Sequence, residues 1–380
     1  MQKEKEIVSA RPFFDNAAIR NILADVKKTL KSGLLTEGPY VKKFEEEFAR
    51  YVGTKEAVAV NSGTCSLEIA FRYFGIRGGE VVVPTNTFIA SGNTVLFAGG
   101  KPVLADIKEE TLCIDPDDAQ KRITSKTRGI MVVHIAGLVC PEINQLREIC
   151  HDHKLFLMED AAHAHGAMID GKKAGSLGDV GSFSFFPTKV MTSCEGGMIT
   201  TDDHKLAHMA RIIRAHGMDK ELGQAVRLGY NWRMHELSAV VGLHQLRQLE
   251  SFIKKRGEIA KKYETGLKKI DGVKSFFTPS NIRHSYYKFP MYVENEIDPG
   301  KLAAFLKSDF HISTGNIYYP PCHLHPLYKE LFKYKEGDLP VSERVLKRVI
   351  ALPMHVLLTT SDVDRVLKAL KISAEKAHIS

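Results

Sequence analysis

An acid and a lysine stand at the ends of two successive predicted strands. The apolar residues 155–158 predict a strand buried on both faces of a parallel sheet, and this strand ends at two acids, of which the second is Asp160. Residues 182–185 alternate serine and phenylalanine, as a strand does, and Lys189 follows the proline that ends this strand. Open α/β sheets bind ligands at the carboxyl ends of their strands. We therefore expect Asp160 and Lys189 to face one crevice.

A carboxylate and a lysine amine in one crevice are the groups that pyridoxal phosphate chemistry needs. The amine forms a Schiff base with the cofactor's aldehyde, and the carboxylate pairs with the protonated ring nitrogen. Opposite charges about 4 Å apart at an effective dielectric constant of ~20 gain roughly 4 kcal/mol, which raises the pKa of the ring nitrogen by about three. Taken singly, Asp160 is more simply a solvent-facing acid and Lys189 a surface lysine, so the pairing depends on the rest of the chain.

A second candidate site binds an anion. Residues 57–60 predict a short buried strand, and the small residues 61–64 lead from it into a helix over residues 65–74. Free N–H groups and the positive end of the helix dipole favour an anion at such a helix start. We therefore assign the phosphate of a cofactor to Gly63 and Thr64. A serine or threonine that only caps the helix accounts for the same residues.

The surrounding elements predict an α/β protein with two domains. Strands are expected over residues 80–84, 101–106 and 130–133, each followed by a helical pattern, which indicates a predominantly parallel sheet. After about residue 251 the pattern changes to a charged helix over residues 254–269, a half-exposed strand and further helices. We expect a large domain over residues 1–251, with an N-terminal helical segment, and a small α+β domain over residues 252–380.

Composition excludes several classes of protein. The chain has 380 residues, of which 44% are hydrophobic and 26% charged, as in ordinary globular proteins. Its net charge of +8 favours anionic partners such as a nucleotide diphosphate sugar, but no basic tract indicates nucleic acid. No apolar stretch approaches the ~20 residues of a membrane span, and the N-terminus carries no secretion signal. We expect a cytoplasmic protein with no nucleic-acid or membrane partner.

Metal and disulfide sites are not predicted. The six cysteines form no CxxC pair, which excludes a recognisable zinc or disulfide framework; they are Cys65, Cys113, Cys140, Cys150, Cys194 and Cys322. His163 and His165 lie close to Asp160 but lack the partner set of a zinc site. We expect free thiols and no metal.

Six segments of the chain, in order, resemble the fold-type-I, pyridoxal-phosphate-dependent sugar aminotransferases of the DegT or StrS family. They are NSGT (61–64), PTNTFIAS (84–91), EDAAHAHGA (159–167), FSFFPTK (183–189), EGGMITT (195–201) and GYNWRM (229–234). The resemblance spans nearly the whole chain, from about residue 11 onward. It implies a large domain with a mostly parallel sheet of the seven-stranded type, a smaller C-terminal α+β domain, and a homodimer with its active sites at the interface.

The resemblance also implies roles for individual residues. Lys189 and Asp160 become the catalytic pair, and Phe88 stacks on the cofactor ring, a contact that contributes on the order of 1 kcal/mol. Ser184 contacts the cofactor phosphate. His163 stands where many members have glutamine, and it can donate the same hydrogen bond to the ring oxygen.

Four further positions follow from the resemblance alone. Asn231 would reach across the dimer interface to the partner's cofactor phosphate. Thr36, Tyr319 and His323 would lie near the sugar substrate. Turn chemistry at the neighbouring Gly-Pro and Pro-Pro pairs accounts equally well for Thr36, Tyr319 and His323. A turn in a loop that enters a helix accounts for Asn231.

The lysine at position 189 favours transamination, because family members with histidine there are sugar dehydratases. We expect a ping-pong transfer of an amino group from glutamate, or from glutamine, to a nucleotide-linked keto-deoxysugar. A keto-cyclitol or a free keto-sugar is an alternative acceptor. A second alternative is a non-catalytic regulator that keeps the cofactor pocket as a sensor, but a sensor has no need of a lysine that moves protons.

Overall fold

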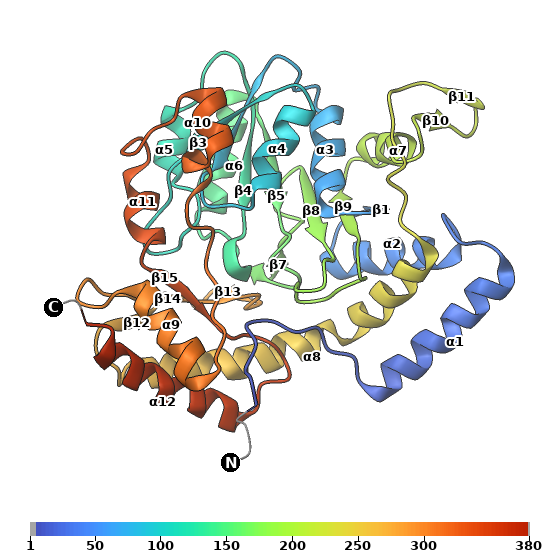
Figure 1. Cartoon of the computed structure of the whole chain (residues 1–380). Coiled ribbons are helices and arrows are strands. Elements are labelled where there is room, and N and C mark those ends of the chain that lie inside the picture. The colour runs from blue at the N-terminus through green and yellow to red at the C-terminus, as the bar shows by residue number, and fades with distance from the viewer. Residues whose placement is uncertain (1–4, 379–380) are drawn as a thin grey trace.

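A seven-stranded sheet forms the centre of the larger part of the molecule (Figure 1). The structure is a computed structural model that describes residues 5–378. The strands lie in the order β1 (Glu56–Val60), β9 (Gly197–Thr201), β8 (Val180–Ser184), β5 (Phe156–Asp160), β4 (Thr127–Val133), β2 (Glu80–Pro84) and β3 (Lys101–Ala105). Only β9 runs antiparallel to its neighbours within this sheet. The mostly parallel α/β sheet expected from the sequence is confirmed.

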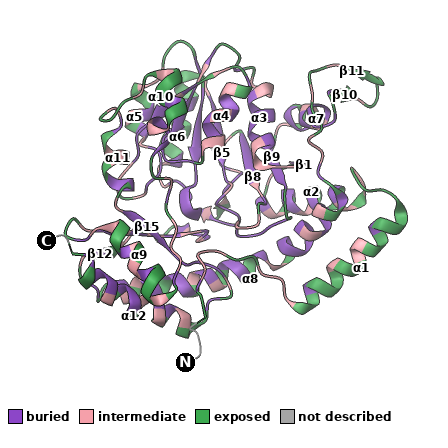
Figure 2. Ribbon diagram, in the orientation of Figure 1, coloured by how far each residue is buried: buried purple, intermediate pink, exposed green. Residues whose placement is uncertain are grey.

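Helices cover both faces of this sheet, which is why its strands are buried almost throughout (Figure 2). One face carries α3 (Gly63–Tyr73), which packs against β8 and β9 and contacts α4 (Ile89–Phe97) and α7 (His204–Ile213). Against β4 and β5 packs α6 (Ile143–His153), which contacts α5 (Pro116–Lys121). The helix α2 (Pro39–Val52) lies against β1 and β9.

A long helix joins the larger part to a second, smaller layer. This helix, α8 (Glu236–Leu267), has 32 residues and takes in residues 254–267 of the charged helix that the sequence predicted over residues 254–269. Its C-terminal half packs beneath a three-stranded antiparallel sheet of β12 (Val273–Ser275), β14 (Phe289–Val293) and β15 (Val349–Leu352). The helices α9 (Pro299–Phe310) and α12 (Thr360–Lys376) pack on this layer.

The remaining elements are short. A hairpin joins β10 (Met218–Asp219) to β11 (Gln224–Ala225), and a small sheet combines β6 (Met168–Ile169), β7 (Lys172–Lys173) and β13 (Ile282–Arg283). Two 3-10 turns are η1 (Ile135–Gly137) and η2 (Cys322–Leu324). No helix in residues 5–378 is long and apolar enough to span a membrane.

Each of the two hydrophobic cores contains residues from both sides of residue 251. Ile7, near the N-terminus, belongs to the core of the smaller layer, together with Tyr263 and Phe289. Conversely, α10 (Pro326–Phe332) and α11 (Pro340–Leu346) lie over the large sheet, where Tyr328 and Leu346 join the larger core (Figure 1). The division at residues 251/252 remains a prediction, and the late segment that carries α10 and α11 packs on the larger part.

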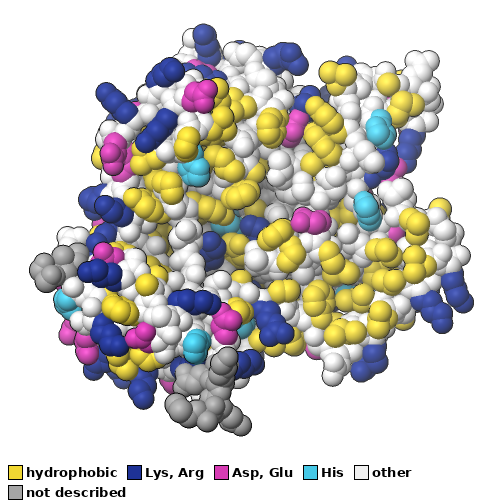
Figure 3. Space-filling view, viewed as in Figure 1, with side chains coloured by type: hydrophobic (Ala, Val, Ile, Leu, Met, Phe, Trp, Pro, Cys, Tyr) yellow, Lys and Arg dark blue, Asp and Glu magenta, His cyan; other side chains and the backbone are white. Residues whose placement is uncertain are grey.

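The N-terminal helix α1 (Asn16–Ser32) extends away from the sheet and contacts the molecule through α8 (Figure 1). Asp15 caps it by accepting a hydrogen bond from the Ala18 amide at 2.6 Å. Two leucines on this helix are strongly exposed, Leu23 at 62% and Leu30 at 57%. Apolar side chains gather on the surface formed by α1 and α8 (Figure 3). A helix that leaves its apolar side chains in solvent has a surface suited to a further partner.

Candidate active site

A cavity of about 430 Å³, here called the central cavity, opens at the carboxyl ends of the parallel strands. Val133, Asp160 and Ser184, the last residues of β4, β5 and β8, all line it. Seven residues that the sequence singled out lie around this one space: Gly63, Thr64, Phe88, Asp160, His163, Ser184 and Lys189. The expected meeting of strand ends in one crevice is therefore present.

The Asp160 carboxylate is held from two sides. The side chain is 6% exposed, and its Oδ2 accepts a hydrogen bond from the Ser91 hydroxyl at 2.8 Å. Its Oδ1 accepts one from the Ala162 amide at 3.2 Å. Hydrogen bonds to both oxygens fix the direction of the side chain. A buried, oriented carboxyl group thus faces the central cavity.

Lys189 lies in the turn that follows β8, where its amide donates to the Phe186 carbonyl at 2.9 Å. The amine is 4.7 Å from the centre of the Tyr287 ring. Burial lowers the pKa of Lys189 to about 8, against the raising effect of Asp160, and the nearby Lys288 lowers it further. At pH 7 about a tenth of this amine is then unprotonated and able to act as a nucleophile, far more than for a lysine with an ordinary pKa.

The start of α3 forms the anion-binding end of the cavity. Ser62 caps the helix by accepting a hydrogen bond from the Cys65 amide at 3.2 Å, and Gly63 and Thr64 of the first turn line the cavity. A Cβ atom on Gly63 would lie 2.8 Å from the Cβ of Ser184. Only glycine therefore lets the helix start approach the end of β8 so closely, and the Ser184 side chain lies beside the helix start.

His163 is a neutral histidine with both nitrogens engaged. Its Nδ1 accepts a hydrogen bond from the Ala136 amide at 3.3 Å, so we assign the proton to Nε2, which lies 2.8 Å from the Tyr318 hydroxyl. Burial holds the pKa of His163 well below its usual range, and the positive charges of Lys189 and Lys288 lower it further.

The sequence model of the DegT/DnrJ/EryC1/StrS aminotransferase family matches residues 16–371. This chain belongs to that family.

Individual relatives cover nearly all of the chain. The spore coat polysaccharide biosynthesis protein SpsC of Bacillus subtilis is 37% identical, over 92% of this chain and 93% of its own. The GDP-perosamine synthase of Caulobacter vibrioides is 35% identical, over 88% and 90%. A Streptococcus pneumoniae protein solved in its PLP-form superposes with a TM-score of 0.92 at 27% identity, over 99% of this chain and all of that one.

The chain is therefore an aminotransferase of a family of sugar aminotransferases, with the fold-type-I architecture, and pyridoxal phosphate is its cofactor. The residues of the central cavity fit that cofactor. They offer a lysine amine, a buried carboxylate, and a helix start with a glycine where any Cβ would fill the space beside Ser184. The ring of Phe88, 58% exposed, lies at the cavity wall.

Several residues that line the cavity were not found from the sequence. Ser91, Thr188, Tyr287, Lys288 and Tyr318 all do so. The segment 285–293 was interpreted only as a half-exposed strand, although its two tyrosines and a lysine in a row are an unusual group. The backbone conformation of Tyr318 marks this residue in the structure, because its φ is 48°. Non-glycine residues in such a left-handed conformation cluster at functional sites.

Three predicted residues lie outside the central cavity. Asn231 is exposed, with its carbonyl 3.4 Å from the side-chain nitrogen of Asn61. Thr36 forms a β-bridge with His235, at the start of α8. Tyr319 lines a different cavity, of about 830 Å³, against α9 and β15. The roles given to Asn231, Thr36 and Tyr319 remain predictions.

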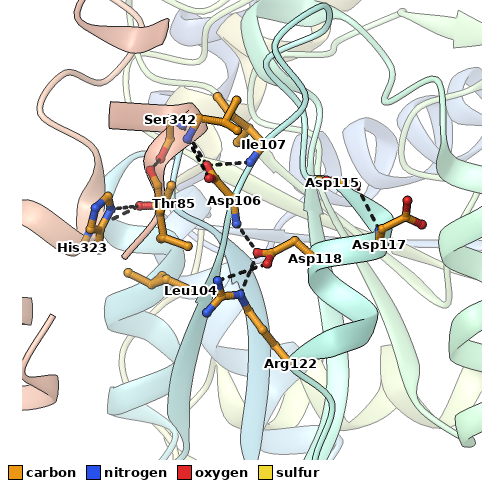
Figure 4. A network of polar contacts seen from close by, with 12 residues as sticks. Thr85, Leu104, Asp106, Ile107, Asp115, Asp117, Asp118, Arg122, His323 and Ser342 are labelled. Atoms are coloured by element: carbon orange, nitrogen blue, oxygen red, sulfur yellow. Dashed lines mark hydrogen bonds and ion pairs between the residues drawn. The ribbon is translucent and has the colours of Figure 1, made fainter. Parts of the chain in front are cut away.

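His323 also lies outside the central cavity. Its side chain is fully buried, and its Nδ1 lies 2.8 Å from the Thr85 hydroxyl at the end of β2 (Figure 4). Its Nε2 lies 2.9 Å from Oε1 of Glu343. Beside it, Asp106 accepts a hydrogen bond from the Ser342 amide at 2.8 Å, at the start of α11 (Figure 4). His323 thus fastens the α10–α11 segment to the large sheet, and its role near the sugar substrate remains a prediction.

No cluster of three or more histidine, cysteine or acidic side chains that could hold a metal ion occurs in residues 5–378. All six cysteines are free thiols, and only Cys194 is exposed.

Proposed function

We propose that this aminotransferase moves an amino group from glutamate, or from glutamine, to a nucleotide-linked keto-deoxysugar by a ping-pong mechanism. The observation that carries the proposal is the meeting of Lys189, Asp160 and the α3 start around one cavity. The chain is 35% identical to a GDP-perosamine synthase, whose name contains a nucleotide-linked product, and this similarity supports a nucleotide-linked substrate. The net charge of +8 favours such an anionic substrate.

In the proposed mechanism, pyridoxal phosphate supplies an electron sink for the bond that breaks at the substrate carbon. Asp160, fixed by Ser91 and Ala162, would hold the proton on the ring nitrogen. The Nζ of Lys189 would accept the proton that leaves the substrate carbon and then donate it to the cofactor carbon. Its pKa of about 8 suits this exchange, because a general base works best when its pKa lies near the working pH.

The other residues of the cavity would bind and orient. Gly63, Thr64 and Ser184 hold the phosphate at the α3 start, as the close approach of Gly63 to Ser184 supports. Phe88 and His163, which both line the cavity, would flank the ring. Because the Nε2 of His163 already faces the Tyr318 hydroxyl, we propose that His163 positions the ring by contact and Tyr318 closes that side of the cavity.

We further propose that the active form is a homodimer. The loop that carries Asn231 leaves three large apolar side chains in solvent: Leu222 at 64%, Leu228 at 79% and Tyr230 at 42% exposed. Phe186, three residues before Lys189, is 45% exposed. A second copy that covers these side chains would let Asn231 reach the partner's cofactor phosphate. Light scattering should therefore give twice the chain mass, and a monomer with full activity would refute this part.

Spectroscopy of the holoenzyme tests the function. Glutamate should convert the visible absorption of the lysine-bound cofactor into that of its amine form, and a nucleotide-linked keto-sugar should restore it. Free keto-sugars and keto-cyclitols are run in parallel, and a response to them alone would transfer the assignment to that alternative. No spectral change with glutamate or glutamine would contradict transamination and favour the regulator.

A further inference from the structure

Lys288 is a second lysine of the central cavity with no role in the mechanism above. It directly precedes β14, and its amine donates to the Asn316 carbonyl at 2.7 Å. The amine lies 5.8 Å and 5.2 Å from the ring centres of Tyr287 and Tyr318. No carboxylate in residues 5–378 pairs with it, and burial lowers the pKa of Lys288 to about 8. A half-buried ammonium group without a counter-ion is costly unless an anion joins it.

Lys288 stands where three cavities meet. It lines the central cavity, a cavity of about 200 Å³ bounded by Thr188, Tyr287 and Gly315, and the cavity of about 830 Å³ that contains Tyr319. The last of these is here called the outer cavity. A ligand whose reacting end lies at Lys189 and whose body extends into the outer cavity would pass the Lys288 amine.

The outer cavity carries an excess of positive charge. Lys288, Lys347 and Arg348 line it, against one acid, Asp298. That acid is already used, because its Oδ1 caps α9 by accepting a hydrogen bond from the Lys301 amide at 2.9 Å.

Arg348 adds a further positive charge to this cavity. Its guanidinium donates to the carbonyls of Val293, Glu294 and Ile297, which fix its position. Asp298 interacts electrostatically with this charge, and one acid does not balance the three cations of the lining. Lys347 beside it is exposed. The outer cavity thus has the electrostatics of a site for a polyanion.

We propose that Lys288 binds the diphosphate of a nucleotide-linked substrate, with the nucleoside in the outer cavity and the sugar in the central cavity. This inference rests on the proposed function, since it assigns the substrate's anionic part to a place in the chain. The alternative anion at Lys288 is the donor carboxylate. Glutamate is small beside an 830 Å³ cavity, and it leaves Lys347 and Arg348 without a ligand. A diphosphate with an attached nucleoside accounts for all three cations.

Calorimetric titration of the holoenzyme with GDP, UDP and dTDP tests the assignment without turnover. The wild type should bind at least one of them. Lys288→Met, which keeps the apolar stem, should weaken the best of these at least about tenfold, the loss expected for a charge-assisted hydrogen bond. Lys288→Arg should recover most of that affinity. Lys347→Met should weaken it several-fold, and Lys371→Met, an exposed lysine on α12, serves as the matched control.

The glutamate half-reaction, followed by absorbance, separates the two sources of the anion. Lys288→Met should lose more affinity for the nucleoside diphosphate than for glutamate. A larger loss of affinity for glutamate than for the nucleoside diphosphate would assign Lys288 to the donor carboxylate and overturn the proposal. Unchanged nucleotide binding in both Lys288→Met and Lys347→Met would also overturn it. So would the absence of nucleotide binding by the wild type. If Lys288→Met does not fold, Lys347→Met decides the matter. A wild type that binds nucleotide but responds to neither glutamate nor glutamine refutes the proposed function instead.

Discussion

The hydroxyl group of Tyr318 lies 2.8 Å from Nε2 of His163. This contact joins two segments far apart in the chain, the turn after β5 and the stretch between α9 and η2, and both residues line the central cavity. The backbone of Tyr318 adopts a left-handed conformation to make it. The protein thus closes one wall of its active site with a residue held in a disfavoured conformation, which indicates that the position is fixed by its surroundings.

Removal of that hydroxyl should cost stability. In Tyr318→Phe, the N–H of His163 loses its acceptor in a site that is 4% exposed. A buried donor without a partner costs about 1–3 kcal/mol. Urea unfolding should show that loss, and the control Tyr319→Phe, at a ring 41% exposed, should show almost none. Equal effects of the two variants would mean that the contact with His163 has no energetic weight.

Neutralising Asp160 should remove most of the activity. Asp160→Asn keeps the shape of the side chain but not the charge that we assign to the ring nitrogen, and the lost attraction of about 4 kcal/mol predicts a fall in kcat of at least ~100-fold. The control Ser91→Ala removes only the hydrogen bond to Oδ2 and should lower kcat by a smaller factor. Steady-state kinetics with glutamate measure both. More than a tenth of the wild-type kcat in Asp160→Asn would contradict the assignment.

The buried carboxylate of Glu236 should be needed for the start of α2. Gly38 offers no side-chain cap, and Glu236, fully buried, accepts hydrogen bonds from the amides of Gly38, Tyr40 and Val41 at 3.0, 2.9 and 2.8 Å. Glu236→Gln presents a donor to these donors and should lose about 2 kcal/mol or more.

Thermal unfolding followed by circular dichroism measures the effect of Glu236→Gln. Glu46→Gln, on the exposed side of the same helix, is the control and should change the midpoint little. A midpoint for Glu236→Gln equal to that of the control would show that the amides of α2 find other acceptors.

Buried histidines should make the protein less stable in mild acid. Burial lowers the pKa of His165 and of His284 to about 3. The unfolded chain takes up these protons near pH 6.5, so it binds more protons than the folded chain between pH 6.5 and about 3. The free energy of unfolding should therefore fall as the pH falls through this window, by about 1.4 kcal/mol per pH unit for each histidine.

Urea unfolding at several pH values between 7 and 5 measures that slope. His165→Leu should remove the share of one histidine, because the side chain packs between the rings of Phe183 and Phe185, where leucine fits. The exposed His151→Leu should leave the slope as it is. A wild-type slope in His165→Leu would place the acid sensitivity elsewhere.

The part of the site that local sequence predicts is the part built at strand ends. Asp160, Ser184 and Gly63 line the cavity because parallel strands end at one edge and a helix starts there, and both facts follow from short-range patterns. Their chemical roles stay predictions. The parallel sheet was found for the same reason, since each strand is a short apolar run followed by a helical pattern.

The remainder depends on contacts between distant segments. Tyr318 and Lys288 reach the cavity only because the smaller layer folds against the larger one, which no local pattern encodes. The position of His323 also depends on distant segments, because its partner Thr85 lies far from it in the chain and, together with Glu343, holds it outside the central cavity. Residues 254–267 continue α8 because no helix stop separates them from its first half, and Gly257 lies within the helix without ending it.

The bond between cofactor and chain is the central claim, and peptide mapping after borohydride reduction tests it most directly. Reduction turns the link between pyridoxal phosphate and a lysine into a stable amine, which mass spectrometry locates. We predict that the label lies on Lys189 and is lost, with turnover, in Lys189→Ala, whose circular dichroism spectrum should match the wild type. A label on Lys288, the other lysine of the cavity, or on no lysine at all, would contradict the account.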